Sequence, residues 1–235
     1  MMESIVQQAK NICDSSITKN NITDMNTLYS QMNTHILLKD APLMRPICKM
    51  IKRIFDIIVA TLFLVLIFPW TYIIIACCIK ICMPGPIIFK QKRTGRNGKV
   101  FVCYKFRTMD AHNHADEYVD PQMNKYSLGN FLRVTSLDEL PQFWNVFKGD
   151  MSIIGPRPHM LVHDKEYMSE IATYSLRYAV KPGITGWAQV NGLRGERDIK
   201  RVKMRVDYDL WYIQHWSLGL DIKIMLRTIG VMIKK

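Results

Sequence analysis

The sequence predicts a mostly helical α+β protein. A membrane-associated helix, broken near its middle, precedes a small helical domain with a short β-hairpin and amphipathic helices at the membrane interface. Three observations predict this class. Residues 57–79 carry no charge, two later runs of β-branched and aromatic residues flank a glycine-containing turn, and several stretches have helical spacing. We expect an extension over residues 1–46, a membrane-associated segment over 47–83 and a domain over 84–235.

The extension is polar, rich in Asn, Thr, Ser and Gln, and two prolines, Pro42 and Pro46, close it. Its periodicity is weak, and it carries no motif that indicates a function.

The uncharged run at residues 57–79 predicts membrane contact. As a straight helix it would reach roughly 34 Å, enough to cross a hydrocarbon core of ~30 Å. Both of its flanks are basic, which is typical of cytoplasmic segments. The flanking charges are Lys49, Lys52 and Arg53 before the run, and Lys80, Lys90, Lys92, Arg93 and Arg96 after it. Pro69 breaks the helix near its middle. A re-entrant hairpin and a kinked spanning helix both remain open.

Beyond the Pro84-Gly85-Pro86 break, residues 87–89 and 100–104 are typical of short strands. The turn at residues 95–98 joins them, so we expect a β-hairpin.

Helical spacing then appears over residues 159–180, 202–216 and 218–233. The last stretch mixes large apolar residues with lysine and arginine. It could lie on an anionic membrane surface, or pack on the core of the domain.

The chain has 32 Lys and Arg residues against 20 Asp and Glu, a net charge of +12. This excess predicts an anionic partner: nucleic acid, an anionic bilayer or a phosphorylated substrate. The cysteines show no regular spacing, which favours a reducing, cytoplasm-facing compartment over disulfides.

An acidic pair, Asp138 and Glu139, lies just before Pro141. Proline is tolerated in the first turn of a helix, so we expect a helix to begin near residues 136–138. Backbone N–H groups there favour negative charge, which would keep a carboxylate ionised and could also seat a phosphate. A purely structural alternative is a capping box formed by Ser136 and Glu139.

Several cations lie where they could meet a phosphate. Arg157 stands between Pro156 and Pro158, which hold its backbone rigidly, as bidentate recognition requires. Lys105 and Arg107 follow the second predicted strand, and strand alternation puts them on one face. Each feature taken alone is also typical of an ordinary loop.

Taken in order, these features resemble the bacterial sugar transferase family, the monotopic polyprenyl-phosphate phosphoglycosyl transferases. The matching blocks run from about Lys52 to Ile233. They are KRIFD at 52–56, Gly85-Pro86 with Phe89 and residues 91–95, KFRTM at 105–109, TSLDELPQ at 135–142, GDMSIIGPRP at 149–158, PGITGWAQVNG at 182–192, DLWY at 209–212 and LDIK at 220–223.

The resemblance implies transfer of a sugar 1-phosphate from a UDP-sugar to a polyprenyl phosphate such as undecaprenyl phosphate, releasing UMP. This step opens the assembly of a surface glycan such as a capsule or exopolysaccharide. By the same resemblance Asp138 is the nucleophile, forming an aspartyl phospho-sugar, and Glu139 supports Mg²⁺. The expected phosphate-binding residues are Lys105, Arg107, Arg133 and Arg157, with Asp209 as a further member of the site.

The resemblance also implies a re-entrant anchor in the inner membrane, with the domain facing the cytoplasm. Family members often carry a serine before the breaking proline, where this chain has Phe68. The block at residues 185–192 is more similar to hexose-1-phosphate transferases than to those for amino sugars, which favours glucose or galactose.

Two other classes of function remain as alternatives: a membrane-tethered basic binding protein and a scaffold without catalysis. Nucleic-acid binding is not expected, because the basic residues are spread among prolines, glycines and the membrane flanks rather than gathered on one helix. A homodimer is compatible with the sequence, which carries no signal of oligomeric state.

Overall fold

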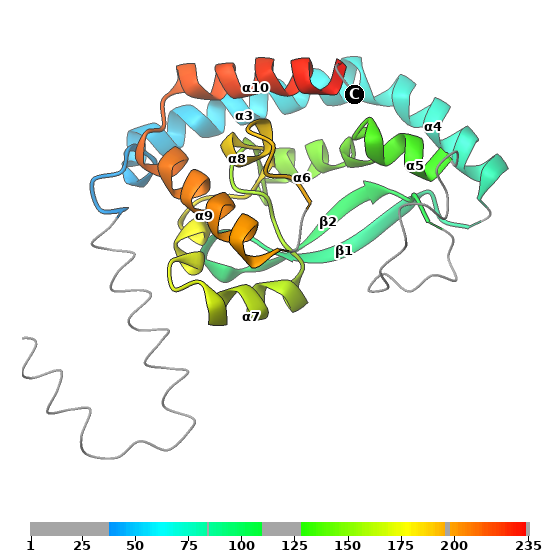
Figure 1. The fold of residues 1–235 in the computed structure, drawn as a ribbon. Helices are drawn as coiled ribbons and strands as arrows, with labels where there is room; N and C mark the ends of the chain where they lie inside the picture. The colour runs from blue at the N-terminus through cyan, green and yellow to red at the C-terminus, as the bar shows by residue number, and fades with distance from the viewer. Residues whose placement is uncertain (1–37, 84, 110–127, 196–197, 234–235) are drawn as a thin grey trace, which may run out of the picture. The chain divides into compact units, whose positions relative to one another are not determined.

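The computed structural model describes residues 38–83, 85–109, 128–195 and 198–233 (Figure 1). Most of the expected extension, residues 1–46, lies outside them. The part Asp40–Lys235 is one compact unit.

The uncharged run forms two helices, α3 (Pro46–Leu66) and α4 (Phe68–Cys82), which meet at a bend of 57°. Pro69 lies in the first turn of α4, where its missing N–H is tolerated. The hydroxyl of Thr71 donates to the carbonyls of Ile67 and Phe68, next to the bend. No single described helix is long and apolar enough to cross a membrane, and the bent pair reaches that length and apolarity only in combination.

The β-hairpin is confirmed, with strands longer than predicted. Strands β1 (Ile88–Thr94) and β2 (Val100–Phe106) pair antiparallel, from Ile88 opposite Phe106 to Thr94 opposite Val100. Asn97 and Gly98 take positive φ angles in the turn, which is why short polar and glycine residues stand there.

The helix predicted over residues 159–180 is wrong in its length. It divides into α7 (Leu161–Glu170) and a 3₁₀ helix, η4 (Tyr174–Ala179). Ile171 ends α7 in an extended conformation, which buries its side chain against Tyr167 and Tyr174.

The two later helices agree with the sequence. Helix α9 (Ile199–Gln214) starts at Asp198, whose carboxylate accepts from the backbone N–H of Lys200, and α10 spans Leu218–Ile233.

Several short elements were not predicted. They are α5 (Leu128–Val134), α8 (Trp187–Val190) and a parallel pair, β3 (Ser152–Ile154) and β4 (Gly183–Thr185). The pair depends on glycine, because a Cβ on Gly183 would collide with the backbone nitrogen of Gly155. Helix α6 (Gln142–Lys148) begins after Pro141, about one turn later than the start predicted near residues 136–138, where a short 3₁₀ helix lies instead.

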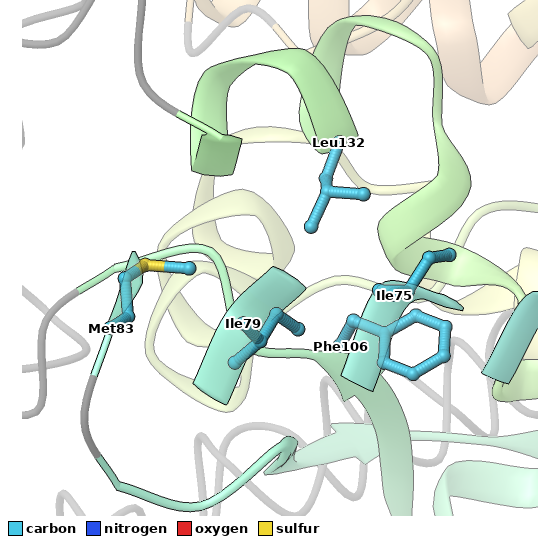
Figure 2. Packing of buried hydrophobic residues seen from close by; sticks show 5 residues of the cluster. All are labelled: Ile75, Ile79, Met83, Phe106 and Leu132. Atoms are coloured by element: carbon cyan, nitrogen blue, oxygen red, sulfur yellow. The ribbon is translucent and has the colours of Figure 1, made fainter. Parts of the chain in front are cut away.

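Both arms of the bent pair pack on the domain. Ile75 and Ile79 of α4, with Met83 just after its end, form a buried cluster with Phe106 of β2 and Leu132 of α5 (Figure 2).

In α3, Lys52 donates to Asp221 of α10 at 2.7 Å, and Asp56 accepts from Ser152 and the N–H of Ile153, both at 2.9 Å. Helix α10 lies beside α3, to which its Asp221 is bonded (Figure 1).

Candidate active site

The acidic pair lies in a 3₁₀ helix, η3 (Leu137–Glu139), immediately before α6. Ser136 precedes it with a φ of 60° and makes no capping hydrogen bond, so the capping box of the structural alternative is absent. Its hydroxyl instead accepts from Arg194 at 3.1 Å. Asp138 and Glu139 are both buried. The turn therefore serves to place two carboxylates side by side.

Glu139 is held by two cations. Arg157 donates to both of its oxygens, at 2.6 and 3.2 Å, and Lys105 donates to the nearer one at 2.9 Å. Burial acts to raise the pKa of Glu139, but Arg157 and Lys105 outweigh it and hold that pKa well below its usual range. Glu139 is therefore ionised and its charge is balanced.

Asp138 is the less constrained carboxylate. Its nearest cation is the Lys105 ammonium, at 3.8 Å. Burial raises the pKa of Asp138 to about 6, with Glu139 adding to the rise and Lys105 opposing it. The sequence predicts that the helix start keeps this carboxylate ionised, whereas burial acts against ionisation and is the largest cause of the rise in its pKa. Asp138 is therefore a carboxylate in an environment that favours its neutralisation.

A second layer supports Arg157. Arg177 donates through one nitrogen to the Arg157 carbonyl at 2.8 Å and to the Asp209 carboxylate at 2.7 Å. The ring of His159 lies 2.9 Å from its other terminal nitrogen. Asp209 is fully enclosed, so it reaches the acidic pair through Arg177 and Arg157.

The sequence comparison decides the family. Residues 47–235 match the profile of the bacterial sugar transferases. The chain belongs to the bacterial sugar transferase family. Curated relatives carry specific names. One from Escherichia coli (strain K12), a UDP-glucose:undecaprenyl-phosphate glucose-1-phosphate transferase, is 43% identical over 97% of this chain and 51% of its own length.

A relative of the same name from Caulobacter vibrioides is 41% identical over 80% of this chain and 72% of its own length. An Aeromonas hydrophila UDP-N-acetylgalactosamine-undecaprenyl-phosphate N-acetylgalactosaminephosphotransferase is 40% identical over 78% of this chain and 44% of its own length. The chain spans about half the length of most of these relatives.

Two further expected phosphate-binding residues, Arg107 and Arg133, have different surroundings from Lys105 and Arg157. Arg107 donates to the Met83 carbonyl, with its guanidinium against Gly85. Strand β2 ends at Phe106, so strand alternation does not extend to Arg107. Arg133 is exposed in the last turn of α5.

Arg194 was missed by the sequence reasoning. Burial and Arg157 lower its pKa, whereas Glu139 and Asp138 act to raise it, which marks it as a neighbour of the acidic pair. Its loop has no periodicity. The signal that the sequence offered for Arg194 was its place in a loop between two glycines, Gly192 and Gly195. Both glycines have positive φ in the structure.

The acidic pair offers a Mg²⁺ ion hard oxygen donors. Among the described residues no three His, Cys, Asp or Glu side chains converge as a metal site. Asp138 and Glu139 supply carboxylate oxygens, which Mg²⁺ prefers, although both Glu139 oxygens already accept from cations. The residues therefore fit an ion that takes most of its ligands from substrate phosphates and water.

Proposed function

We propose that the chain transfers a sugar 1-phosphate from a UDP-sugar to a polyprenyl phosphate, normally undecaprenyl phosphate, giving a polyprenyl-diphosphate sugar and UMP. The family and the names of the relatives support this reaction. The observation that carries it is the contrast within the acidic pair: Glu139 is neutralised by Arg157 and Lys105, while Asp138 keeps a reactive carboxylate in a buried setting.

The proposed mechanism has two displacements at one phosphorus. A carboxylate oxygen of Asp138 attacks the β-phosphorus of the UDP-sugar, and the bond from that phosphorus to the bridging oxygen breaks as UMP leaves. An oxygen of the polyprenyl phosphate then attacks the same phosphorus. The Asp138–phosphorus bond breaks, which restores the carboxylate and releases the product.

Cations around the pair stabilise charge on the phosphoryl group. Lys105 lies between both carboxylates, and Arg157 is held rigidly by its bonds to Glu139. Such fixed donors favour a transition state in which negative charge spreads over phosphate oxygens. Mg²⁺, held by Glu139 and the diphosphate, would add charge neutralisation.

Membranes carrying the protein test the reaction directly. They are incubated with a UDP-sugar labelled in the sugar and with undecaprenyl phosphate, and lipid-linked label and UMP are measured. Asp138→Asn should abolish both products, while Asp207→Asn, an exposed carboxylate on α9, should not. A binding or scaffold protein would form neither product in any variant.

Glucose is the proposed sugar, because the relatives from E. coli and C. vibrioides are named for UDP-glucose. Parallel assays with UDP-glucose, UDP-galactose and UDP-N-acetylgalactosamine test it. A higher kcat/KM for either of the other two would change the assignment.

We further propose that α3 and α4 form a re-entrant anchor in the inner membrane, with the domain on the cytoplasmic face. Lys52 and Asp56 in α3, and Ile75 and Ile79 in α4, all pack on the same domain. Both arms therefore return to one side. The outward surfaces of α3, α4 and α10 carry exposed apolar side chains, including Leu62, Leu66, Trp70, Ile74, Leu226 and Ile229.

An epitope placed within residues 1–45 tests this topology. In intact spheroplasts it should resist antibody and protease, and in inverted vesicles it should be accessible. Exposure in spheroplasts would show that the bent pair spans the membrane.

A further inference from the structure

A cavity of about 260 Å³ lies between α3, the hairpin turn and the segment before β4. The acidic pair does not line it. Its charged lining residues are five cations and one carboxylate: Lys49, Lys52, Arg53, Arg96, Lys181 and Asp56. Its volume exceeds the ~30 Å³ share of one water molecule several-fold, so it has room for a polyatomic ion.

Three of these charged groups are already used within the protein. Lys52 pairs with Asp221, and Asp56 accepts from Ser152 and Ile153. Arg53 donates to the carbonyls of Val146 and Phe147, at the C-terminal end of α6. These contacts hold α3 on the domain and account for why the three residues are there.

The other three cations have no such partner among the residues that the structure describes. Within the described part of the chain, no hydrogen bond or ion pair engages the charged groups of Lys49, Arg96 or Lys181. Lys49 and Lys181 are half-buried and Arg96 is exposed, so the cluster is reachable from solvent. Unpaired cations that converge on one hollow favour an anion.

The cations also lie close to one another. An Arg53 guanidinium nitrogen and the Lys181 ammonium lie 3.3 and 3.4 Å from the point that a Cβ on Gly149 would occupy. Burial lowers the pKa of Lys181, and the charges of Arg53 and Arg96 lower it further, against an opposing effect of Asp56 and Asp150. A bound anion would relieve this repulsion.

We propose that this cavity is a second phosphate-binding site, in which Lys49, Arg96 and Lys181 bind a phosphate group. Arginine and lysine together suit a phosphate, which offers several acceptor oxygens. The same chemistry belongs to an anionic phospholipid headgroup and to a free phosphate. A lipid could reach the site, because Met50 lines it and is 58% exposed, next to exposed Ile47 and Ile54 on α3.

The test is the thermal stability of the full chain in a non-ionic detergent, with inorganic phosphate, glycerol 1-phosphate or dihexanoyl phosphatidylglycerol as probes. Sodium chloride of equal ionic strength is the reference. At ten times Kd, binding should raise the Tm by about 3–6 °C. The variant Arg96→Gln/Lys181→Gln should lose at least half of that rise in Tm. The rise that remains would come from phosphate bound by the cations around Asp138 and Glu139. The matched control is Lys165→Gln/Lys203→Gln, two exposed lysines.

A rise with all three probes identifies a site for free phosphate, and a rise with the lipid alone identifies a headgroup site. Single Arg96→Gln, at an exposed position, gives the same comparison if the double variant does not fold. Equal responses of the wild type and the cavity variants to every probe, or an equal rise with chloride, would overturn the proposal. The measurement involves no turnover, so it stands apart from the proposed transferase activity.

Discussion

Arg157 binds both carboxylate oxygens of Glu139, at 2.6 and 3.2 Å. This bidentate contact orients the guanidinium and removes Glu139 as a free base. The neighbouring Asp138, whose nearest cation is 3.8 Å away, is the proposed nucleophile. The two carboxylates differ in their electrostatic surroundings because their cationic partners differ.

The geometry of this pair predicts the effect of Arg157→Lys. A lysine keeps the charge but cannot make two parallel bonds, so kcat/KM should fall about 10²-fold while the chain stays folded. Steady-state assays with a Tm measurement check this. Arg45→Lys, an exposed arginine, is the matched control and should change neither. Unchanged turnover in Arg157→Lys would show that the bidentate contact is not needed.

The raised pKa of Asp138 predicts the pH dependence of the reaction. The ionised carboxylate attacks, so kcat/KM should fall as pH drops through about 6. Lys105 lowers this pKa, so Lys105→Met should move the acidic limb to higher pH. Glu139 raises it, so Glu139→Gln should move the limb to lower pH. Profiles of kcat/KM against pH give the midpoint of each acidic limb independently of the maximal kcat/KM. If both variants shift the midpoint in the same direction, the limb does not report Asp138.

A covalent intermediate predicts release of UMP without an acceptor. With UDP-glucose alone, the protein should release about one UMP per active site in a burst and retain sugar label after denaturation. Asp138→Asn should show neither, and Asp207→Asn should show both. If UMP appears only when polyprenyl phosphate is added, the lipid phosphate attacks directly.

Features with a regular period could be predicted from the sequence. The hairpin and α10 follow from alternation and helical spacing, and Pro69 marks the bend. Strands β3 and β4 could not be predicted, because three residues give no period and their pairing depends on the contact between Gly155 and Gly183.

The candidate site could be predicted only in part, because some of its residues lie in segments without a regular period. Lys105, Asp138, Glu139 and Arg157 do come together. Arg194 and Arg177 are brought there by loops and by tertiary packing, which leave no local pattern.

The contact between Arg177 and Asp209 predicts that Asp209 acts through position. Asp209→Asn should leave a buried guanidinium without its counter-ion, which costs about 3–5 kcal/mol. The Tm should fall by roughly 6–20 °C, and kcat should fall with it as Arg157 loses its support. Calorimetry and assays check both, with Asp207→Asn as the exposed control. Loss of activity at an unchanged Tm would instead indicate that Asp209 contacts the substrate.

Each arm of the bent pair is held on the domain by its own contacts, α3 through Lys52 and Asp56 and α4 through its apolar cluster with Phe106. This predicts how the proposed anchor responds to mutation. Lys52→Met removes the cation from Asp221, which keeps Tyr212 and Trp216 as its side-chain donors within the described residues. Phe106→Ala opens a cavity beneath α4, at about 3–5 kcal/mol. Each single variant should lower the Tm in detergent and keep the epitope at residues 1–45 on the cytoplasmic side, because the other arm still holds.

The double variant Lys52→Met/Phe106→Ala should release both arms, so protease should cut between the bent pair and the domain much faster than in either single variant. Lys80→Met, an exposed lysine near the end of α4, should leave cleavage unchanged. The two sites share no partner, so their effects on Tm should add. A single variant that already moves the epitope across the membrane would mean that one arm alone determines the topology.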